Sequence, residues 1–158
     1  MIERCSAREL GDIHEVINDG AQAYRGVIAA DRWHEPYMAM QELEREIAAG
    51  VAFWGFYEGG RLLGVMGLQP VQDVKLIRHA YTRTEAQGRG IGSALLAELA
   101  RSEDRPILVG TWRAALWAVA FYRGRGFELV AEEEKAALLR RYWSIPERQI
   151  EESVVLRR

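Results

Sequence analysis

The chain has 158 residues, of which 49% are hydrophobic and 28% are charged, and its formal net charge is −2. This length suits one domain with a buried core, and the balanced charge excludes a strongly basic surface of the kind that binds nucleic acid or an acidic membrane. The single cysteine, Cys5, excludes an internal disulfide, and no apolar run has the length of a signal peptide or a membrane span, so we expect a cytoplasmic protein without a metal site.

The first fifty residues predict two helices. Ser6 and Glu9 have the spacing of a capping box, and apolar residues follow them at helical intervals. Pro36 suits the first turn of the second helix, and Gly50 suits its end. The segment between the two helices, residues 23–38, is dense in aromatic and charged residues.

Three strands are predicted next. Residues 51–70 contain two aromatic and aliphatic runs joined by Glu58-Gly59-Gly60-Arg61, a pattern that predicts a hairpin. Residues 74–82 predict the third strand, and a glycine-rich loop follows it.

After the loop, helices and strands alternate. In chain order they are helix 91–103, strand 105–112, helix 114–126, strand 127–134, helix 135–143 and strand 150–158. We interpret the glutamates at 132–134 as the solvated end of a strand. This order predicts a single α/β (α+β) domain over residues 1–158, with a mixed sheet covered by helices on both faces.

The glycine-rich loop places Gly88, Gly90 and Gly92 within five residues, directly before a predicted helix. Glycine permits backbone conformations that aim several N–H groups into one concavity, and the dipole of the following helix adds positive potential. The loop therefore predicts a site for an anion such as a pyrophosphate, held without a metal.

Three interpretations of this loop compete. A plain strand-to-helix turn is one, and a dinucleotide-binding fingerprint is another. The fingerprint requires the first strand of a parallel unit and an acidic residue about twenty positions further on, whereas here the loop lies past the midpoint and Asp104 comes early. A nucleoside triphosphate loop would need a lysine before Ser93. The third interpretation is a cradle for the pyrophosphate of coenzyme A.

Two motifs carry this third interpretation. Gln87-Gly88-Arg89-Gly90-Ile91-Gly92 resembles the Q/R-x-x-G-x-G pattern of the GNAT superfamily of acyl-CoA-dependent N-acyltransferases. The segment AVAFYRGRGF, residues 118–127, resembles the A-x-x-F-Y-x-x-x-G-F segment of the same superfamily, in the same order along the chain. The resemblance implies a GNAT-type fold with a mostly antiparallel, twisted sheet of about six to seven strands. It also implies an N-acetyltransferase that moves an acetyl group from acetyl-CoA to a primary amine by direct attack in a ternary complex.

The resemblance also implies where coenzyme A binds. The cofactor contacts carried over from the family are Ala80, Tyr81, Thr82, Gln87, Gly88, Arg89, Gly90, Ile91, Gly92 and Ser93. A main-chain N–H near His79 or Ala80 is expected to face the developing oxyanion. Many relatives carry Asn at the position of Ala115, and because that contact is missing here we expect Thr111 or Arg113 to replace it.

Tyr122 is the residue that the resemblance assigns as general acid, since a phenol with a pKa of about 10 is protonated at neutral pH. Packing in the core is the alternative for this side chain. His79 is a candidate general base, although strand alternation places it on the face opposite Arg78, where it could instead pack in the core. Glu35 and His34 are alternative bases.

In GNAT proteins the connection between the first two helices lines the acceptor side of the cleft. Tyr24, Trp33, His34 and Glu35 are therefore expected to bind the acceptor, with a solvated helix–loop–helix as the alternative. Trp112, Trp117 and Trp143 are interpreted as packing groups. The expected partner is a small-molecule amine or a peptide or protein amine, and neither nucleic acid nor a membrane is expected.

Two other functions stay open at this point. One is a coenzyme A-binding sensor or regulatory module without turnover, and the other is an oxidoreductase that uses a nicotinamide dinucleotide. Cys5, near the start of the chain, is a poor nucleophile candidate, which argues against a covalent enzyme intermediate. The C-terminal strand sometimes pairs across a dimer in such proteins, so a homodimer is a further alternative.

Overall fold

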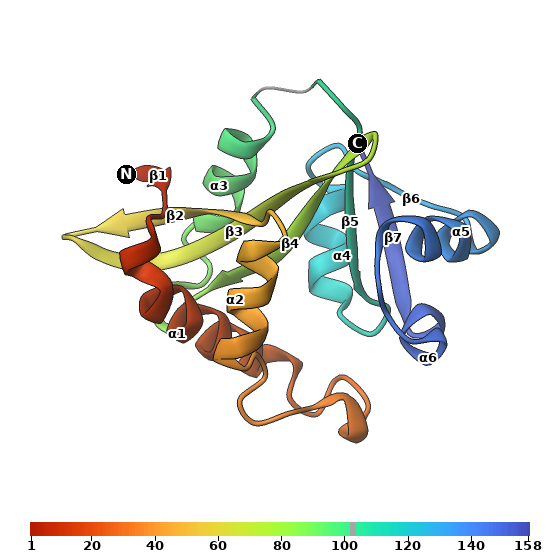
Figure 1. Cartoon of the computed structure of the whole chain (residues 1–158), viewed down its shortest axis with the longest axis horizontal. Helices are drawn as coiled ribbons and strands as arrows, with labels where there is room; N and C mark the ends of the chain where they lie inside the picture. The colour runs from red at the N-terminus through yellow and green to blue at the C-terminus, as the bar shows by residue number, and fades with distance from the viewer. Residues whose placement is uncertain (102–103) are drawn as a thin grey trace.

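The computed structural model describes residues 1–101 and 104–158 (Figure 1). Within these residues, one sheet of seven strands has the order β1-β2-β3-β4-β5-β7-β6. Every pair of neighbouring strands is antiparallel except β4 and β5, which are parallel. The fold is thus the predicted mixed, mostly antiparallel sheet.

The strands are β1 (Ile2–Arg4), β2 (Ala52–Glu58), β3 (Arg61–Val71), β4 (Val74–Thr82), β5 (Ile107–Trp112), β6 (Glu128–Leu129) and β7 (Ser153–Arg157). The α-helices are α1 (Leu10–Gly20), α2 (Met40–Ala48), α3 (Ile91–Leu99), α4 (Leu116–Arg123), α5 (Glu132–Tyr142) and α6 (Glu147–Glu151). Short 3-10 turns are η1 (Ala7–Glu9), η2 (Ala21–Tyr24), η3 (Ala30–Arg32) and η4 (Thr84–Ala86). Among the described residues, no helix combines the length and hydrophobicity needed to cross a bilayer.

Helices cover both faces of the sheet, as predicted. On β4, Ile77 packs into the apolar cluster that contains α3 and Tyr122 of α4, while the adjacent Leu76 packs into a cluster with Tyr142 of α5. This alternation follows from the two-residue repeat of a strand. Helices α1 and α2 cover β2 and β3 on the face opposite α3 through a further cluster that includes Leu43 (Figure 1).

Several sequence predictions of local structure are confirmed. Ser6 and Glu9 form the capping box, with the Ser6 backbone N–H donating to the Glu9 carboxylate at 2.8 Å. The hairpin turns where expected, because Glu58 pairs with Arg61 in the β2–β3 register. The predicted strand at residues 74–82 is β4. These elements are specified by neighbours in the sequence, which is why a local pattern was sufficient to find them.

The prediction that Pro36 lies in the first turn of the second helix is wrong, since α2 begins at Met40. Side chains of α1 hold the intervening segment in another conformation. Asn18 accepts from the backbone N–H of Met38 at 2.8 Å and donates to the Met38 carbonyl at 3.0 Å, and His14 Nε2 contacts the same carbonyl at 2.8 Å. These partners satisfy the backbone groups of Met38 outside a helix.

The end of the chain also differs from the prediction. The first turn of α5, instead of a strand end, contains Glu132, Glu133 and Glu134. Their negative charges interact favourably with the positive end of the helix dipole. The strand predicted over 127–134 is reduced to β6, and β7 begins only at Ser153 because α6 precedes it. Strand β1 was not predicted at all. Helix α3 ends at Leu99, and residues 102–103 of its predicted range lie outside the described residues.

Candidate active site

The central feature of the sheet is a pair of neighbouring strands that separate. Strands β4 and β5 pair only from Lys75 to Ile77 and from Ile107 to Val109, yet β4 continues to Thr82 and β5 to Trp112. Beyond the paired residues, β4 stays bonded to β3 and β5 to β7, so the two halves of the sheet diverge (Figure 1). The divergence leaves backbone N–H and C=O groups along the facing edges without a strand partner, and such groups are available to a ligand.

A cleft of about 1010 Å³ occupies this opening. It extends from the glycine-rich loop across the separated strands to α4, η2 and the segment after α5. Most of the predicted site residues line it: Tyr24, His79, Ala80, Tyr81, Thr82, Gln87, Gly88, Gly90, Ile91, Gly92, Ser93 and Tyr122. Arg89, Trp33, His34 and Glu35 are predicted site residues that do not line it.

The glycine-rich loop forms one end of the cleft. Gly88 and Gly90 have φ values of +79° and +81°, and Gly90 is the N-cap of α3. A Cβ atom at either glycine would meet nothing within 4 Å, so the backbone conformation, not lack of space, is what requires glycine there. The Gln87 side chain donates to the Thr82 carbonyl at 3.3 Å and ties the loop to the end of β4.

A cation that the sequence analysis missed stands beside this loop. Arg125 Nε donates to the Ser93 hydroxyl at 2.8 Å, and its Nη1 donates to the Phe121 carbonyl at 2.9 Å. Its guanidinium carbon lies 4.0 Å from the centre of the Phe121 ring. Arg125 lines the cleft and forms no ion pair with any described carboxylate, whereas Arg89 is paired with Glu58 outside it. Its place inside the 118–127 motif was the signal in the sequence.

Tyr122 is the one buried residue of α4. Its ring lies edge-on to Phe121 and Phe127, with centroids 5.0 Å and 5.4 Å away. Tyr122 lines the cleft, and its hydroxyl forms no hydrogen bond with the part of the chain that the structure describes. Burial, and then the nearby Tyr24, raises the pKa of Tyr122 above its ordinary value, so the phenol carries its proton at neutral pH.

A bulge interrupts β4 at the mouth of the opening. In the β3–β4 register Val65 pairs with Tyr81 and Gly67 with Arg78, so Met66 stands opposite two residues, His79 and Ala80. His79 has a φ of +55°, which is uncommon for a residue other than glycine. The prediction that His79 and Arg78 point to opposite faces is therefore wrong, because the bulge breaks the alternation of side chains.

Both of these side chains reach the same carboxylate, that of Glu46 on α2. His79 Nε2 lies 2.8 Å from each of the two Glu46 carboxylate oxygens, and Arg78 Nη2 donates to one of them. Burial raises the pKa of Glu46, but the hydrogen bond with His79 and the charge of Arg78 outweigh it and hold the pKa below its ordinary value. Glu46 was not predicted, because nothing in its local pattern separates it from other glutamates of a solvated helix.

Aromatic side chains line the other end of the cleft. Tyr24 lies 5.8 Å from Tyr37, 6.1 Å from Tyr81 and 5.7 Å from Trp117, measured between ring centroids. Trp112 Nε1 donates to the Tyr37 hydroxyl at 3.1 Å and fixes this wall to β5. Burial raises the pKa of Tyr24 to about 12, so its hydroxyl is neutral at ordinary pH. Trp117 is 47% exposed and lines the cleft while its ring packs against Tyr24.

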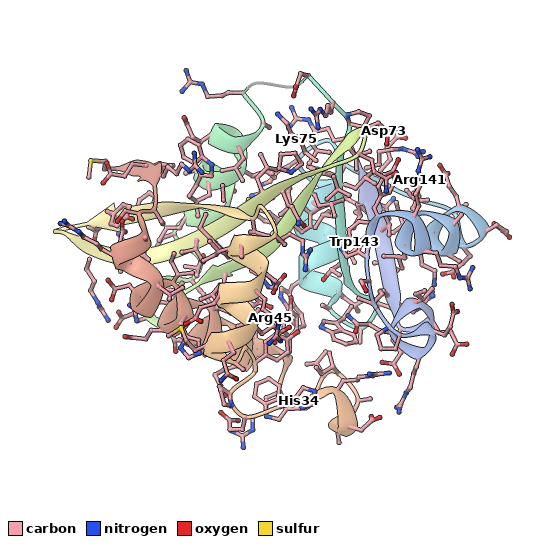
Figure 2. All side chains as sticks on the ribbon, in the orientation of Figure 1. His34, Arg45, Asp73, Lys75, Arg141 and Trp143 are labelled. Carbon is pink, nitrogen blue, oxygen red and sulfur yellow. The ribbon has the colours of Figure 1, made fainter. Side chains whose placement is uncertain are left out.

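The remaining predicted acceptor residues lie on the loop outside this wall. Trp33 packs against Tyr37 at 5.6 Å and donates through Nε1 to the Glu35 carboxylate at 3.1 Å. His34 is exposed on the same loop, at the edge of the molecule (Figure 2). Asp31 pairs with Arg148 of α6, with Nη2 and Oδ1 2.9 Å apart, which ties the loop to the other half of the sheet. None of Trp33, His34 and Glu35 reaches the cleft in this arrangement.

Comparison with protein families shows which family the chain belongs to. Residues 17–140 match the profile described as "Acetyltransferase (GNAT) domain". The chain belongs to the GNAT acetyltransferase family. Among curated proteins no relative matches the chain.

Solved structures show the same GNAT fold. The PaiA N-acetyltransferase from Thermoplasma acidophilum, in complex with coenzyme A, has a TM-score of 0.74 and 17% identity, over 100% of this chain and 97% of that one. A ribosomal-protein-alanine N-acetyltransferase from Brucella melitensis has a TM-score of 0.68 and 19% identity, over 100% and 98%. N-acetylglutamate synthase from Neisseria gonorrhoeae, complexed with coenzyme A and N-acetyl-glutamate, has a TM-score of 0.67 and 20% identity, over 100% of this chain and 34% of that one.

One departure from the GNAT pattern can be placed in the structure. Ala115, where many relatives carry Asn, is fully buried at the N-cap of α4. Of its two expected replacements, Thr111 lines the cleft, whereas Arg113 turns away and pairs with Glu132 at 2.6 Å. Within the described ranges, no group of three or more His, Cys, Asp or Glu side chains is arranged to hold a metal ion.

Proposed function

We propose that this GNAT protein transfers an acetyl group from acetyl-CoA to a primary amine by direct attack within a ternary complex. One observation carries the proposal. A single cleft joins a loop built to hold an anion, a buried phenol that keeps its proton, and an imidazole that is hydrogen-bonded to a carboxylate.

The residues at the loop fit the diphosphate of coenzyme A. The left-handed glycines Gly88 and Gly90 and the start of α3 present backbone N–H groups, and Arg125 adds a cation without a carboxylate partner among the described residues. The unpaired edges of β4 and β5 are suited to hydrogen bonds with the amide groups of the pantetheine arm. When bound, acetyl-CoA supplies an activated thioester.

Tyr122 is the proposed general acid. As the C–N bond forms and the C–S bond breaks, its hydroxyl gives a proton to the departing sulfur. The raised pKa of Tyr122 ensures that the proton is present before transfer. The bulge places His79 and Ala80 opposite the single residue Met66, both residues line the cleft, and a main-chain N–H there is suited to stabilise the oxyanion.

His79 is the proposed general base. Most primary amines arrive protonated at neutral pH and must lose a proton before they can attack. His79 lines the cleft, and imidazole has a reference pKa that suits this task. Glu35, the other candidate, accepts from Trp33 and lies outside the cleft, which favours His79.

Cys5 offers no route through an acetylated enzyme. Burial raises the pKa of its thiol to about 11, so that it is not a thiolate at neutral pH. The side chain packs beside Tyr57, whose hydroxyl donates to its sulfur at 3.3 Å, and it does not line the cleft. Direct attack by the amine is the route that fits these facts.

The acceptor end supports an amine, free or at the end of a peptide. Its aromatic wall of Tyr24, Tyr37, Tyr81 and Trp117 suits an amine with an apolar body. Two similar proteins, by name, act on ribosomal-protein alanine and form N-acetylglutamate, which supports this acceptor class.

The proposal is tested by incubating the protein with acetyl-CoA and a panel of small amines, amino acids and short peptides. Released thiol and acetylated product, identified by mass spectrometry, are expected to appear together in equal amounts. Binding of acetyl-CoA without product on any amine would instead support a coenzyme A sensor. Thermal protection by a nicotinamide dinucleotide and none by coenzyme A would support the oxidoreductase.

A further inference from the structure

Glu46 connects two elements, α2 and β4, and lies outside both the glycine-rich loop and the motif at residues 118–127. It projects from α2 to β4, where His79 and Arg78 converge on it. The side chains of Glu46 and His79 are each 15% exposed. A carboxylate so largely buried needs partners, and these two supply them.

The geometry specifies which nitrogen of His79 carries the hydrogen. Nε2 lies 2.8 Å from both oxygens of an acceptor-only carboxylate, so Nε2 is the donor. In the neutral ring the lone pair is then on Nδ1. Nδ1 forms no hydrogen bond with any residue that the structure describes, and His79 is one of the residues that line the cleft.

The surroundings fix the ring further. Phe53 of β2 is stacked on the imidazole, with centroids 6.3 Å apart and planes at 25°. Arg78 is held between Glu46 and Gln69, whose Oε1 accepts from Nη1 at 3.0 Å. The charged groups around the pair are thus Glu46 itself, Arg78 on β4 and Arg45 on α2. The charges of both arginines lower the pKa of Glu46.

We propose that Glu46 is a positioning residue: it holds the Nε2–H of His79 so that Nδ1 faces the acceptor amine and takes its proton. This inference rests on the proposed function. It adds Glu46 as the group that orients His79 to accept a proton. When the amine nitrogen bonds to the acetyl carbon, its N–H proton passes to Nδ1. The imidazolium that results keeps its Nε2–H directed at the Glu46 carboxylate, which offsets the new charge.

The first test measures the tautomer directly, without turnover. The chain has three histidines, so nitrogen NMR spectra of wild type and His79→Gln assign the His79 ring. We expect the neutral ring to carry its hydrogen on Nε2 in the wild type and to lose this preference in Glu46→Gln. A wild-type ring with its hydrogen on Nδ1 would overturn the inference and leave the proposed function standing.

The second test measures catalysis. Glu46→Gln is expected to lower kcat by about 10-fold or more and His79→Gln by about 100-fold, with acetyl-CoA binding unchanged in both. The double variant is expected to match His79→Gln alone, because the two residues act as a unit. In Glu46→Gln the acidic limb of the pH profile moves to lower pH, since a neutral amide does not stabilise the imidazolium.

Glu44→Gln is the matched control, because Glu44 is exposed on the same helix and is expected to leave kcat and the pH profile unchanged. Thermal unfolding checks that each variant is folded. A Glu46→Gln enzyme with wild-type kcat and an unmoved acidic limb would overturn the role of Glu46 while acetyl transfer stands. Absence of turnover in the wild type would overturn both.

Discussion

Arg125, in the motif at residues 118–127, and Ser93, which directly follows the glycine motif, are joined by a hydrogen bond of 2.8 Å between Nε and the serine hydroxyl. The contact holds the guanidinium at the start of α3, next to the glycine-rich loop. A second bond to the Phe121 carbonyl and stacking on the Phe121 ring fix its plane. The cation is therefore pre-organised for an anion before any ligand arrives.

Arg125→Ala is expected to weaken acetyl-CoA binding by about 10- to 100-fold, because a hydrogen bond to a charged group contributes about 1.5–3 kcal/mol. The expected loss shrinks at high salt. Titration calorimetry measures the change in Kd. Arg123→Ala is the matched control, since Arg123 is exposed on the same helix end and does not line the cleft. Equal losses in the two variants would contradict the assignment.

Tyr122→Phe is expected to lower kcat by about 100-fold with little change in the Kd for acetyl-CoA, because only the proton donor is removed. Tyr142→Phe, which removes a hydroxyl bonded to Asp73 outside the cleft, is the control and is expected to keep its kcat. Steady-state rates and calorimetry provide the two numbers. A Tyr122→Phe enzyme that keeps the wild-type kcat would remove Tyr122 from the acid role.

The raised pKa of Tyr122 also predicts the alkaline side of the pH profile. An acid must be protonated to act, and a pKa above the ordinary value of 10 keeps the phenol protonated to higher pH. We therefore expect kcat to be flat from neutral pH to about pH 9.5. Stopped assays with a saturating amine test this, and a kcat that falls steadily above pH 8 would contradict it.

Gly90→Ala is expected to destabilise the fold by about 1–2 kcal/mol, the cost of placing an L side chain at a left-handed φ. The same change is expected to weaken acetyl-CoA binding, because the loop N–H groups move. Gly11→Ala is the matched control. Gly11 lies in α1, and a Cβ atom added there would meet nothing within 4 Å, so this substitution is expected to raise the free energy of unfolding by about 0.5–1 kcal/mol. Urea unfolding measures both. A neutral Gly90→Ala would show that the conformation of the loop is not required.

The lowered pKa of Glu46 predicts how the free energy of unfolding depends on pH. Burial raises its pKa, but the hydrogen bond with His79 and the charge of Arg78 leave it below the ordinary 4.5. A carboxyl whose folded pKa is depressed stabilises the fold fully above its unfolded pKa and loses this contribution as pH falls through the folded value. Wild type and Glu46→Gln are thus expected to differ most in unfolding free energy above pH 4.5 and to converge in stronger acid. A gap that widens on acidification would refute this.

Local patterns were sufficient for much of the fold and for part of the cleft. Strand β4, the hairpin at Glu58–Arg61 and the Ser6 capping box are each set by residues close in sequence. The loop at 87–92 was found because the positive φ angles of its own backbone require glycine, and glycine is visible in the sequence. Tyr122 came from the resemblance of residues 118–127 to the GNAT segment, and this residue lies on α4 and lines the cleft.

Contacts between distant residues set the rest. Glu46 and His79 are 33 positions apart, and only the bulge in β4 brings Arg78 and His79 to the same carboxylate. The start of α2 moved to Met40 because Asn18 and His14, on another helix, bind the backbone of Met38. No pattern of neighbouring residues contains such pairings, since they depend on how the elements pack.

The central claim is that the acyl donor lies with its diphosphate against the loop before α3. Backbone amide NMR spectra recorded during a titration with acetyl-CoA test it most directly. We expect the amide signals of residues 88–93 and 80–82 to shift in a saturable way, with one binding constant for all of them. If acetyl-CoA left those amides unmoved while a nicotinamide dinucleotide shifted them, the account would be contradicted.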